Sequence, residues 1–184
     1  MKENIFSTPI YHDKIDLNKI IINNQKFEKT FDCEVTTSHN FKNTIEEKSF
    51  IYLKKKIKNL LEKDIDINFD IILTSIWENK YIDNDYQEKH IHPDSHFSFI
   101  IYKEIDVSKT IFYSPHSKLL ETYFYKFPYF FKTMSPSFKP NFTKGDMVLF
   151  PSFLEHAVLK HSGSTTISGN IILKNYSAST KSQD

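Results

Sequence analysis

The chain has very little cysteine and glycine and no arginine. Of its 184 residues, one is cysteine and three are glycine, and all 24 basic residues are lysine. Cys33 alone cannot form an internal disulfide, and there is no C-x-x-C pair to hold zinc. A reducing, cytoplasmic compartment is therefore expected. Without arginine, a bound carboxylate must be held by lysine, hydroxyl or backbone N–H groups.

Excess charge and long apolar runs are also absent. The formal net charge is +1, whereas nucleic-acid-binding proteins usually carry a marked basic excess on one face. No apolar run approaches the roughly 18 residues of a membrane-spanning helix, and the N-terminus lacks the apolar segment of a signal peptide. Neither a membrane nor a nucleic acid is expected as a partner. A chain of this length can bury a substantial core as one domain.

Helical periodicity is confined to the N-terminal third. Apolar residues at three- and four-residue steps predict a helix over 46–63. A weaker pattern predicts a helix over 17–27 with Asp16 as its N-cap, and 5–10 is predicted to form a short edge strand. Later runs rich in β-branched and aromatic residues predict strands over 67–77, 97–102, 107–113, 147–150, 157–159 and 166–174.

This order of elements predicts a mainly β fold, with N-terminal helices packed outside a β-sandwich or jelly roll. We expect a single domain. Residues 1–64 would form a strand and supporting helices, 65–176 the β-rich core, and 177–184 a tail. The aromatic-rich segment 119–131 is expected to pack in the core, with a substrate-facing insert as the alternative.

A cluster of histidines lies near the middle of the chain. On an extended segment, residues two apart project from the same face, so His90 and His92 would point together. His92 and Asp94 would also do so if the strand geometry survives Pro93. His156, after a distant apolar strand, is the candidate for a further ligand. Two imidazoles and a carboxylate are typical of non-haem Fe(II) oxygenases, whereas three imidazoles suit zinc, copper or iron. Four histidines stand singly and are expected to be ordinary surface or hydrogen-bonded residues: His12, His39, His116 and His161.

Five stretches carry a resemblance to a known family. They are 6–11, 75–79, 87–102, 145–156 and 167–170. In this order they resemble a family of 2-oxoglutarate/Fe(II)-dependent oxygenases that is often found in marine bacteria and their phages. The most specific part is an H-x-H-P-x-S segment followed by G-D-x-x-x-F-P-x-x-x-x-H. The resemblance implies a double-stranded β-helix, which is a cupin-like jelly roll, with Fe(II) and 2-oxoglutarate as cofactors. It also implies O₂ as a co-substrate and hydroxylation of a small molecule or a protein side chain.

The resemblance further implies a metal site drawn from His90, His92, Asp94 and His156. If His92 is the first ligand, Asp94 supplies the carboxylate of an H-x-D pair. If His90 is the first ligand, His92 stands where the carboxylate normally would. Both alternatives stay open, with Asp94 the most replaceable of the four.

The last strand departs from the family pattern. Ser164 stands where the family has an arginine that pairs with the distal carboxylate of 2-oxoglutarate, and Gly169 stands where it has phenylalanine. A buried carboxylate without a partner is costly, so another group must hold it or the co-substrate differs. Lys103 or Lys174 is expected to replace the arginine, assisted by hydroxyl groups of Tyr102, Thr166 or Ser168. Asn79 matches the family's Trp-x-Asn and is expected either to bind the cofactor or to be a strand-terminal amide.

Two other classes of function stay open. One is a cupin-like metalloprotein that does not use 2-oxoglutarate, which the missing arginine favours. The other is a non-catalytic jelly-roll module that binds a partner. Succinate formation from 2-oxoglutarate separates the oxygenase from both, and metal content separates the second class from the third.

Overall fold

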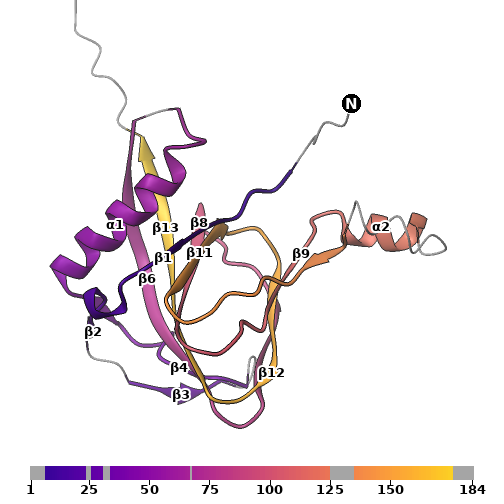
Figure 1. Ribbon diagram of the computed structural model, residues 1–184, viewed down its shortest axis with the longest axis horizontal. Helices are drawn as coiled ribbons and strands as arrows, with labels where there is room; N and C mark the ends of the chain where they lie inside the picture. Colours follow the sequence, from indigo (N-terminus) through magenta and orange to yellow (C-terminus); the bar gives the residue numbers. More distant parts are fainter. Residues whose placement is uncertain (1–6, 24–25, 31–33, 67, 125–134, 176–184) are drawn as a thin grey trace, which may run out of the picture.

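The described residues form two large antiparallel β-sheets and a two-stranded one, with a long helix on the outside of the largest sheet (Figure 1). A computed structural model describes residues 7–23, 26–30, 34–66, 68–124 and 135–175. Within these ranges, the larger sheet has the strand order β1 (Tyr11–Lys14), β11 (Asp146–Pro151), β8 (Phe97–Glu104), β13 (Ser164–Asn175), β6 (Phe69–Tyr81), β4 (Thr36–Thr37) and β3 (Glu28–Lys29). The smaller sheet has the order β10 (Ser137–Phe138), β9 (Thr110–Tyr113), β12 (His156–His161) and β7 (Asp85–His90). This arrangement confirms the predicted jelly roll.

The alternation of side chains along the strands creates two apolar layers. On β8, Phe99 and Ile101 join the cluster beneath the helix, whereas Ile100 and Tyr102 join a cluster that includes Phe112 of the smaller sheet. Successive residues of a strand face opposite sides of a sheet, so one strand supplies both layers. The second layer is the interior of the jelly roll.

The predicted helix over 46–63 is confirmed as α1 (Glu47–Leu61), which covers the outer face of the larger sheet (Figure 1). Its apolar stripe is buried because these positions share one face of a 3.6-residue repeat. The buried aliphatic residues of this stripe are Leu53, Ile57, Leu60 and Leu61.

The helix predicted over 17–27 is wrong. In the described part of this range, residues 17–23 and 26–27, the only helical element is a 3₁₀ turn at Leu17–Lys19. The predicted cap is confirmed, because Asp16 Oδ1 accepts a hydrogen bond from the N–H of Asn18 at 3.1 Å. Ile22 instead belongs to β2 (Ile22–Asn23), which pairs with β5 (Thr44–Ile45). Pairing with a distant strand outweighs a weak local preference for helix.

The strand predicted over 5–10 is displaced along the chain. Residues 7–10 are irregular, residues 5 and 6 lie outside the described ranges, and pairing with β11 begins at Tyr11. The six later β-rich runs each overlap a strand, and β7 was not predicted.

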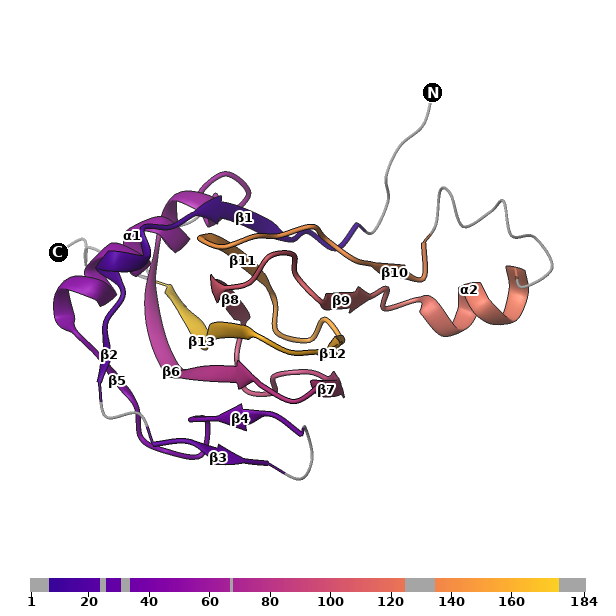
Figure 2. The same ribbon diagram turned by 60° about the horizontal axis from the view of Figure 1, so that its bottom comes forward.

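The segment 119–131 is described only in part. Its first residues belong to α2 (Ser117–Phe124), which projects away from both sheets (Figure 2), while 125–131 lie outside the described ranges. Leu119 is 57% exposed, so this residue does not pack in the core. In the part of the chain that the structure describes, no helix has both the length and the apolar character needed to cross a bilayer.

Candidate metal centre

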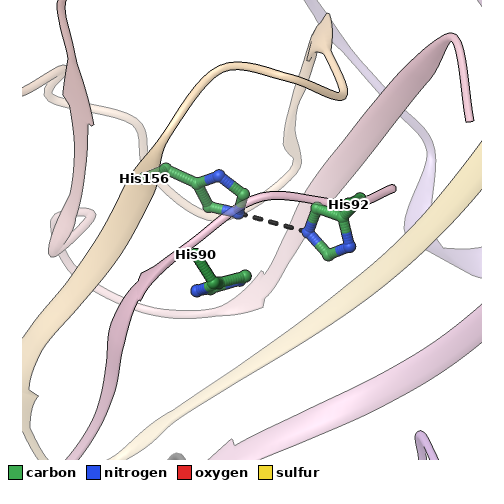
Figure 3. Close-up of side chains that lie close together, drawn as sticks. All are labelled: His90, His92 and His156. Carbon is green, nitrogen blue, oxygen red and sulfur yellow. Dashed lines mark hydrogen bonds between the residues drawn. The ribbon is translucent and has the colours of Figure 1, made fainter. Parts of the chain in front are cut away.

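Three histidines converge at one end of the smaller sheet. His90 is the last residue of β7, His156 is the first of β12, and the two are directly paired in the antiparallel register. His92 follows in the loop after β7. The ligand nitrogens of the three side chains all lie within 4.8 Å of one another. Figure 3 shows His156 and His92 facing each other, with the ring of His90 beside them. The predicted meeting of the early histidine pair with His156 is confirmed.

The loop that carries His92 is held to the end of β11 by backbone hydrogen bonds. The N–H of His92 donates to the carbonyl of Ser152 at 3.0 Å, and the N–H of Ser152 donates to the carbonyl of His96 at 3.1 Å. Asp94 lies at the turn of this loop with a φ of 61°, a left-handed conformation that aspartate tolerates. Its side chain is exposed, and it does not belong to the group of converging ligand atoms found among the described residues.

Hydrogen bonds fix the orientation of two of the rings. Nδ1 of His156 donates to the carbonyl of Leu154 at 3.0 Å, and Nδ1 of His90 donates to the carbonyl of Glu88 at 2.6 Å. A carbonyl oxygen only accepts, so Nδ1 carries the hydrogen and Nε2 keeps its lone pair. Such contacts to backbone carbonyls are typical of the histidines that bind metals.

The spacing of two of the three nitrogens suits one ion. Nε2 of His92 lies 3.3 Å from Nε2 of His156 (Figure 3). Two nitrogens that each lie about 2.1 Å from an ion, with an angle of about 100° between the bonds, are about 3.2 Å apart. The observed distance therefore needs almost no adjustment for both imidazoles to hold the same metal.

Burial keeps the three imidazoles neutral. It lowers the pKa of His156 to about 3, and the nearby rings of His90 and His92 lower it further. It also lowers the pKa of His92 to about 4, with His90 and His39 adding to the effect. The pKa of His90 is lowered mainly by burial, against the opposing hydrogen bond to Glu88. Neutral imidazole is the form that binds a metal, so the site is ready for one at pH 7.

Aromatic residues and a wide groove surround the histidines. The ring of Phe150 meets His156 edge-on at 4.8 Å between centroids, and Trp77 lies 5.6 Å from His92. A groove of about 900 Å³ opens over His90 and His92, and the β3–β4 hairpin forms part of its wall. Both histidines therefore contribute to the lining of this groove.

Four of the residues predicted to bind the cofactor lie beside the groove or in a second pocket. Asn79 is buried beside the groove, where its Oδ1 accepts from Thr37 Oγ1 at 2.6 Å. A second, smaller pocket lies deeper in the jelly roll. Three of the predicted residues line it: Tyr102, Thr166 and Ser168.

The two lysines expected to replace the arginine do not reach either pocket. Lys103 forms an ion pair with Glu78 at 3.1 Å, on the face of β8 opposite to Tyr102, because neighbouring residues of a strand face opposite sides. Lys174 is exposed near the end of β13, past Asn170 and away from Thr166.

Sequence analysis missed a different lysine. Lys109, which immediately precedes β9, lines the smaller pocket together with Thr110 and Gln87. Lys109 lies directly before a β-rich run, but this position does not separate it from Lys103 and Lys174, which also lie near strand ends.

Comparisons with known proteins agree with this geometry. The family described as "Putative 2OG-Fe(II) oxygenase" matches residues 75–168, a range that contains all three converging histidines. No curated protein matches the sequence. Among solved structures, an oxidoreductase of the 2OG-Fe(II) oxygenase family from Burkholderia pseudomallei is similar in fold, with a TM-score of 0.53 and 9% identity over 80% of this chain and 72% of that one. A prolyl-4-hydroxylase from Pseudomonas putida gives a TM-score of 0.48 and 12% identity over 80% of this chain and 77% of that one.

Proposed function

From the premise that this chain belongs to the 2OG-Fe(II) oxygenase family, we propose that His90, His92 and His156 hold the iron. The observation that carries the proposal is the convergence of three neutral imidazoles, with the Nδ1 hydrogens of two of them engaged by backbone carbonyls. The donor set fits Fe(II), for which imidazole is a suitable ligand. Asp94 is not part of this proposal, because it is exposed and outside the converging group.

The enzyme uses 2-oxoglutarate and Fe(II) as cofactors. When bound, they supply the oxidising chemistry, in which O₂ is consumed, 2-oxoglutarate becomes succinate and CO₂, and a substrate is oxidised. The chain's own residues position these partners. The three imidazoles would hold the iron, and the rings of Phe150 and Trp77 pack against two of them, His156 and His92, which would help to fix their positions.

We further propose that the substrate is a small molecule or a protein side chain that enters the groove over His90 and His92. Its volume of about 900 Å³ lies within the usual range of ligand sites. Trp77 and His39, whose rings meet edge-on at 4.6 Å, would contact an apolar part of the substrate. A reducing compartment suits both the single cysteine and the retention of iron as Fe(II).

Succinate formation is the test of this function. The purified protein is incubated with Fe(II), ascorbate, 2-oxoglutarate and O₂, and succinate is measured by mass spectrometry. We expect slow succinate formation without substrate, and no succinate formation in His156→Ala. His116→Ala should match the wild type, because His116 is exposed and is not one of the three converging histidines. A protein that binds iron but forms no succinate would instead be a metalloprotein of other chemistry. One that binds neither would be a non-catalytic jelly roll.

A further inference from the structure

The smaller pocket combines one lysine with an unusual number of hydroxyl groups. Its polar lining includes Tyr102, Thr110, Thr166 and Ser168, and the lysine is Lys109. The hydroxyl of Tyr102 donates to Thr110 Oγ1 at 2.9 Å and accepts from Ser108 Oγ at 3.3 Å. Burial raises the pKa of Tyr102 to about 12, so its hydroxyl keeps the hydrogen that it donates to Thr110, and the hydrogen of the Thr110 hydroxyl remains for another acceptor.

Strand register places this pocket two residues along β12 from the metal centre. On β12, His156 pairs with His90 on one side and Phe112 on the other, whereas Val158 pairs with Gln87 and Thr110. Val158 and its two partners, Gln87 and Thr110, all line the pocket. Two residues along a strand span about 7 Å, which is comparable to the length of the 2-oxoglutarate carbon chain.

Register pairs of the larger sheet also line this pocket. Along β13, Thr166 pairs with Tyr102 and Ser168 pairs with Ile100, and all four line the pocket. Ile100 and Val158 supply an apolar wall between the metal centre and the hydroxyl groups, which suits the two methylene groups of 2-oxoglutarate.

Lys109 is the lysine that lines the smaller pocket, and it forms no ion pair with an acidic residue in the part of the chain that the structure describes. It is half-buried, and the ion pairs of the described residues do not include it. The nearest acidic group on β7, Asp85, is paired with Lys29 at 3.2 Å. The pKa of His161 is lowered first by burial and also by the charge of Lys109, which puts the ammonium near the pocket.

We propose that Lys109 pairs with the distal carboxylate of 2-oxoglutarate, with the hydroxyl of Thr110 as a further donor. This inference rests on the proposed function. It assigns to a lysine at the start of β9 the role that the missing arginine of the last strand leaves open. The pocket holds about 10 Å³, the space of about one water molecule, so the carboxylate enters as the flexible side chains of Lys109 and Gln87 change rotamer.

The test compares two ketoacids. 2-Oxobutyrate keeps the metal-binding ketoacid group but has no distal carboxylate. Binding of each ketoacid to the Mn(II)-loaded protein is measured by calorimetry in the wild type, Lys109→Met and Lys109→Arg. Lys103→Met is the matched control, because Lys103 neighbours the site in sequence but pairs with Glu78 on the opposite face.

We expect Lys109→Met to weaken 2-oxoglutarate binding by at least about tenfold, the loss usual when one partner of a buried charged pair is removed. Its affinity for 2-oxobutyrate should change by less than about twofold, Lys109→Arg should recover part of the loss, and Lys103→Met should match the wild type. Equal affinity of Lys109→Met and the wild type for 2-oxoglutarate would overturn the inference, and so would an equal loss for both ketoacids. If the wild type itself binds Mn(II) but no 2-oxoglutarate, the proposed function fails instead.

Discussion

The histidine group depends on two features of single residues. His90 and His156 meet because they are register partners on β7 and β12, and His92 joins them because its backbone is tied to Ser152. The sequence predicted that the histidine pair would meet His156, but it did not predict this register, because β7 was not anticipated as a strand. It could not separate Asp94 from His92, because the left-handed turn at Asp94 directs the chain away from strand geometry.

Removing His156 should abolish specific metal binding. We expect His156→Ala to weaken Mn(II) or Fe(II) binding by at least about a hundredfold, since only two ligands would remain. Isothermal titration of the metal into the apo protein measures this loss, and His116→Ala should leave the affinity unchanged. Unaltered affinity in His156→Ala would rule out this metal site.

Asp94 gives the complementary prediction. Because its side chain is exposed and outside the converging group, Asp94→Asn should bind metal within about threefold of the wild type. A first-ligand role for His92 with an Asp94 carboxylate would instead make this variant as defective as His156→Ala. The same titration therefore decides between the two ligand sets.

Gly169 lies against an aromatic ring of the neighbouring strand. It is the register partner of Phe99 on β8. A Cβ at this position would lie 2.5 Å from Cζ of Phe99 and 2.8 Å from the carbonyl oxygen of Ser75. The ring of Phe99 thus fills the space over the glycine, as aromatic residues do across a sheet.

Gly169→Ala should therefore destabilise the fold. We expect a loss of about 1–3 kcal/mol in the free energy of unfolding, the usual range for overpacking in a core, measured by urea denaturation. In a Phe99→Leu background the same change should cost less, because the ring is no longer in the way. A loss below about 0.5 kcal/mol in the wild-type background would show that the contact is relieved without strain.

At the scale of elements, strong periodicity was predictive and weak periodicity was not. The stripe of α1 is long enough to specify a helix by itself, whereas the weaker pattern after Asp16 gives way to the pairing of Ile22–Asn23 with β5. β7 was missed because its sequence, Asp85 to His90, is polar and lacks the β-branched residues of a typical strand. As the edge strand of the smaller sheet, it needs only the pairing with β12.

Packing of α1 on the larger sheet should contribute strongly to stability. Leu53 is 1% exposed on the buried stripe, and Ile51, two residues away, is 59% exposed. Leu53→Ala should lower the free energy of unfolding by about 2–5 kcal/mol, and the control Ile51→Ala should change it by less than about 0.5 kcal/mol. Urea denaturation compares the two. Equal effects would mean that α1 does not depend on this stripe.

At the scale of the whole molecule, metal binding joins two segments that are far apart in the sequence. His90 and His92 lie near the middle of the chain, and His156 lies 64 residues beyond His92. A ligand that binds only the folded state adds about 2.7 kcal/mol at a concentration of 100 Kd. For a domain of this size, that raises the Tm by about 5–10 °C.

Differential scanning calorimetry checks this expectation. Mn(II) should raise the Tm of the wild type, a chelator should reverse the rise, and His156→Ala should show none at the same Mn(II) concentration. A rise of equal size in both proteins would mean that the metal binds elsewhere on the folded chain.

The lysine proposed to bind the distal carboxylate of 2-oxoglutarate could not be identified from the sequence. Lys103 and Lys174 lie at strand ends as Lys109 does, and only the packing of the two sheets shows which of the three faces the interior. The parity of a residue on its strand is set by register and bulges, and irregularities interrupt the pairing of β13 with β8 near Thr165. A pattern of lysines in a sequence does not contain that information.

An anomalous-difference map of a crystal grown without oxygen in the presence of Fe(II) tests the three-histidine centre most directly. The account predicts one iron peak about 2.1 Å from a nitrogen of each of His90, His92 and His156. A peak bound by the Asp94 carboxylate in place of one imidazole, or located away from these residues, would contradict it.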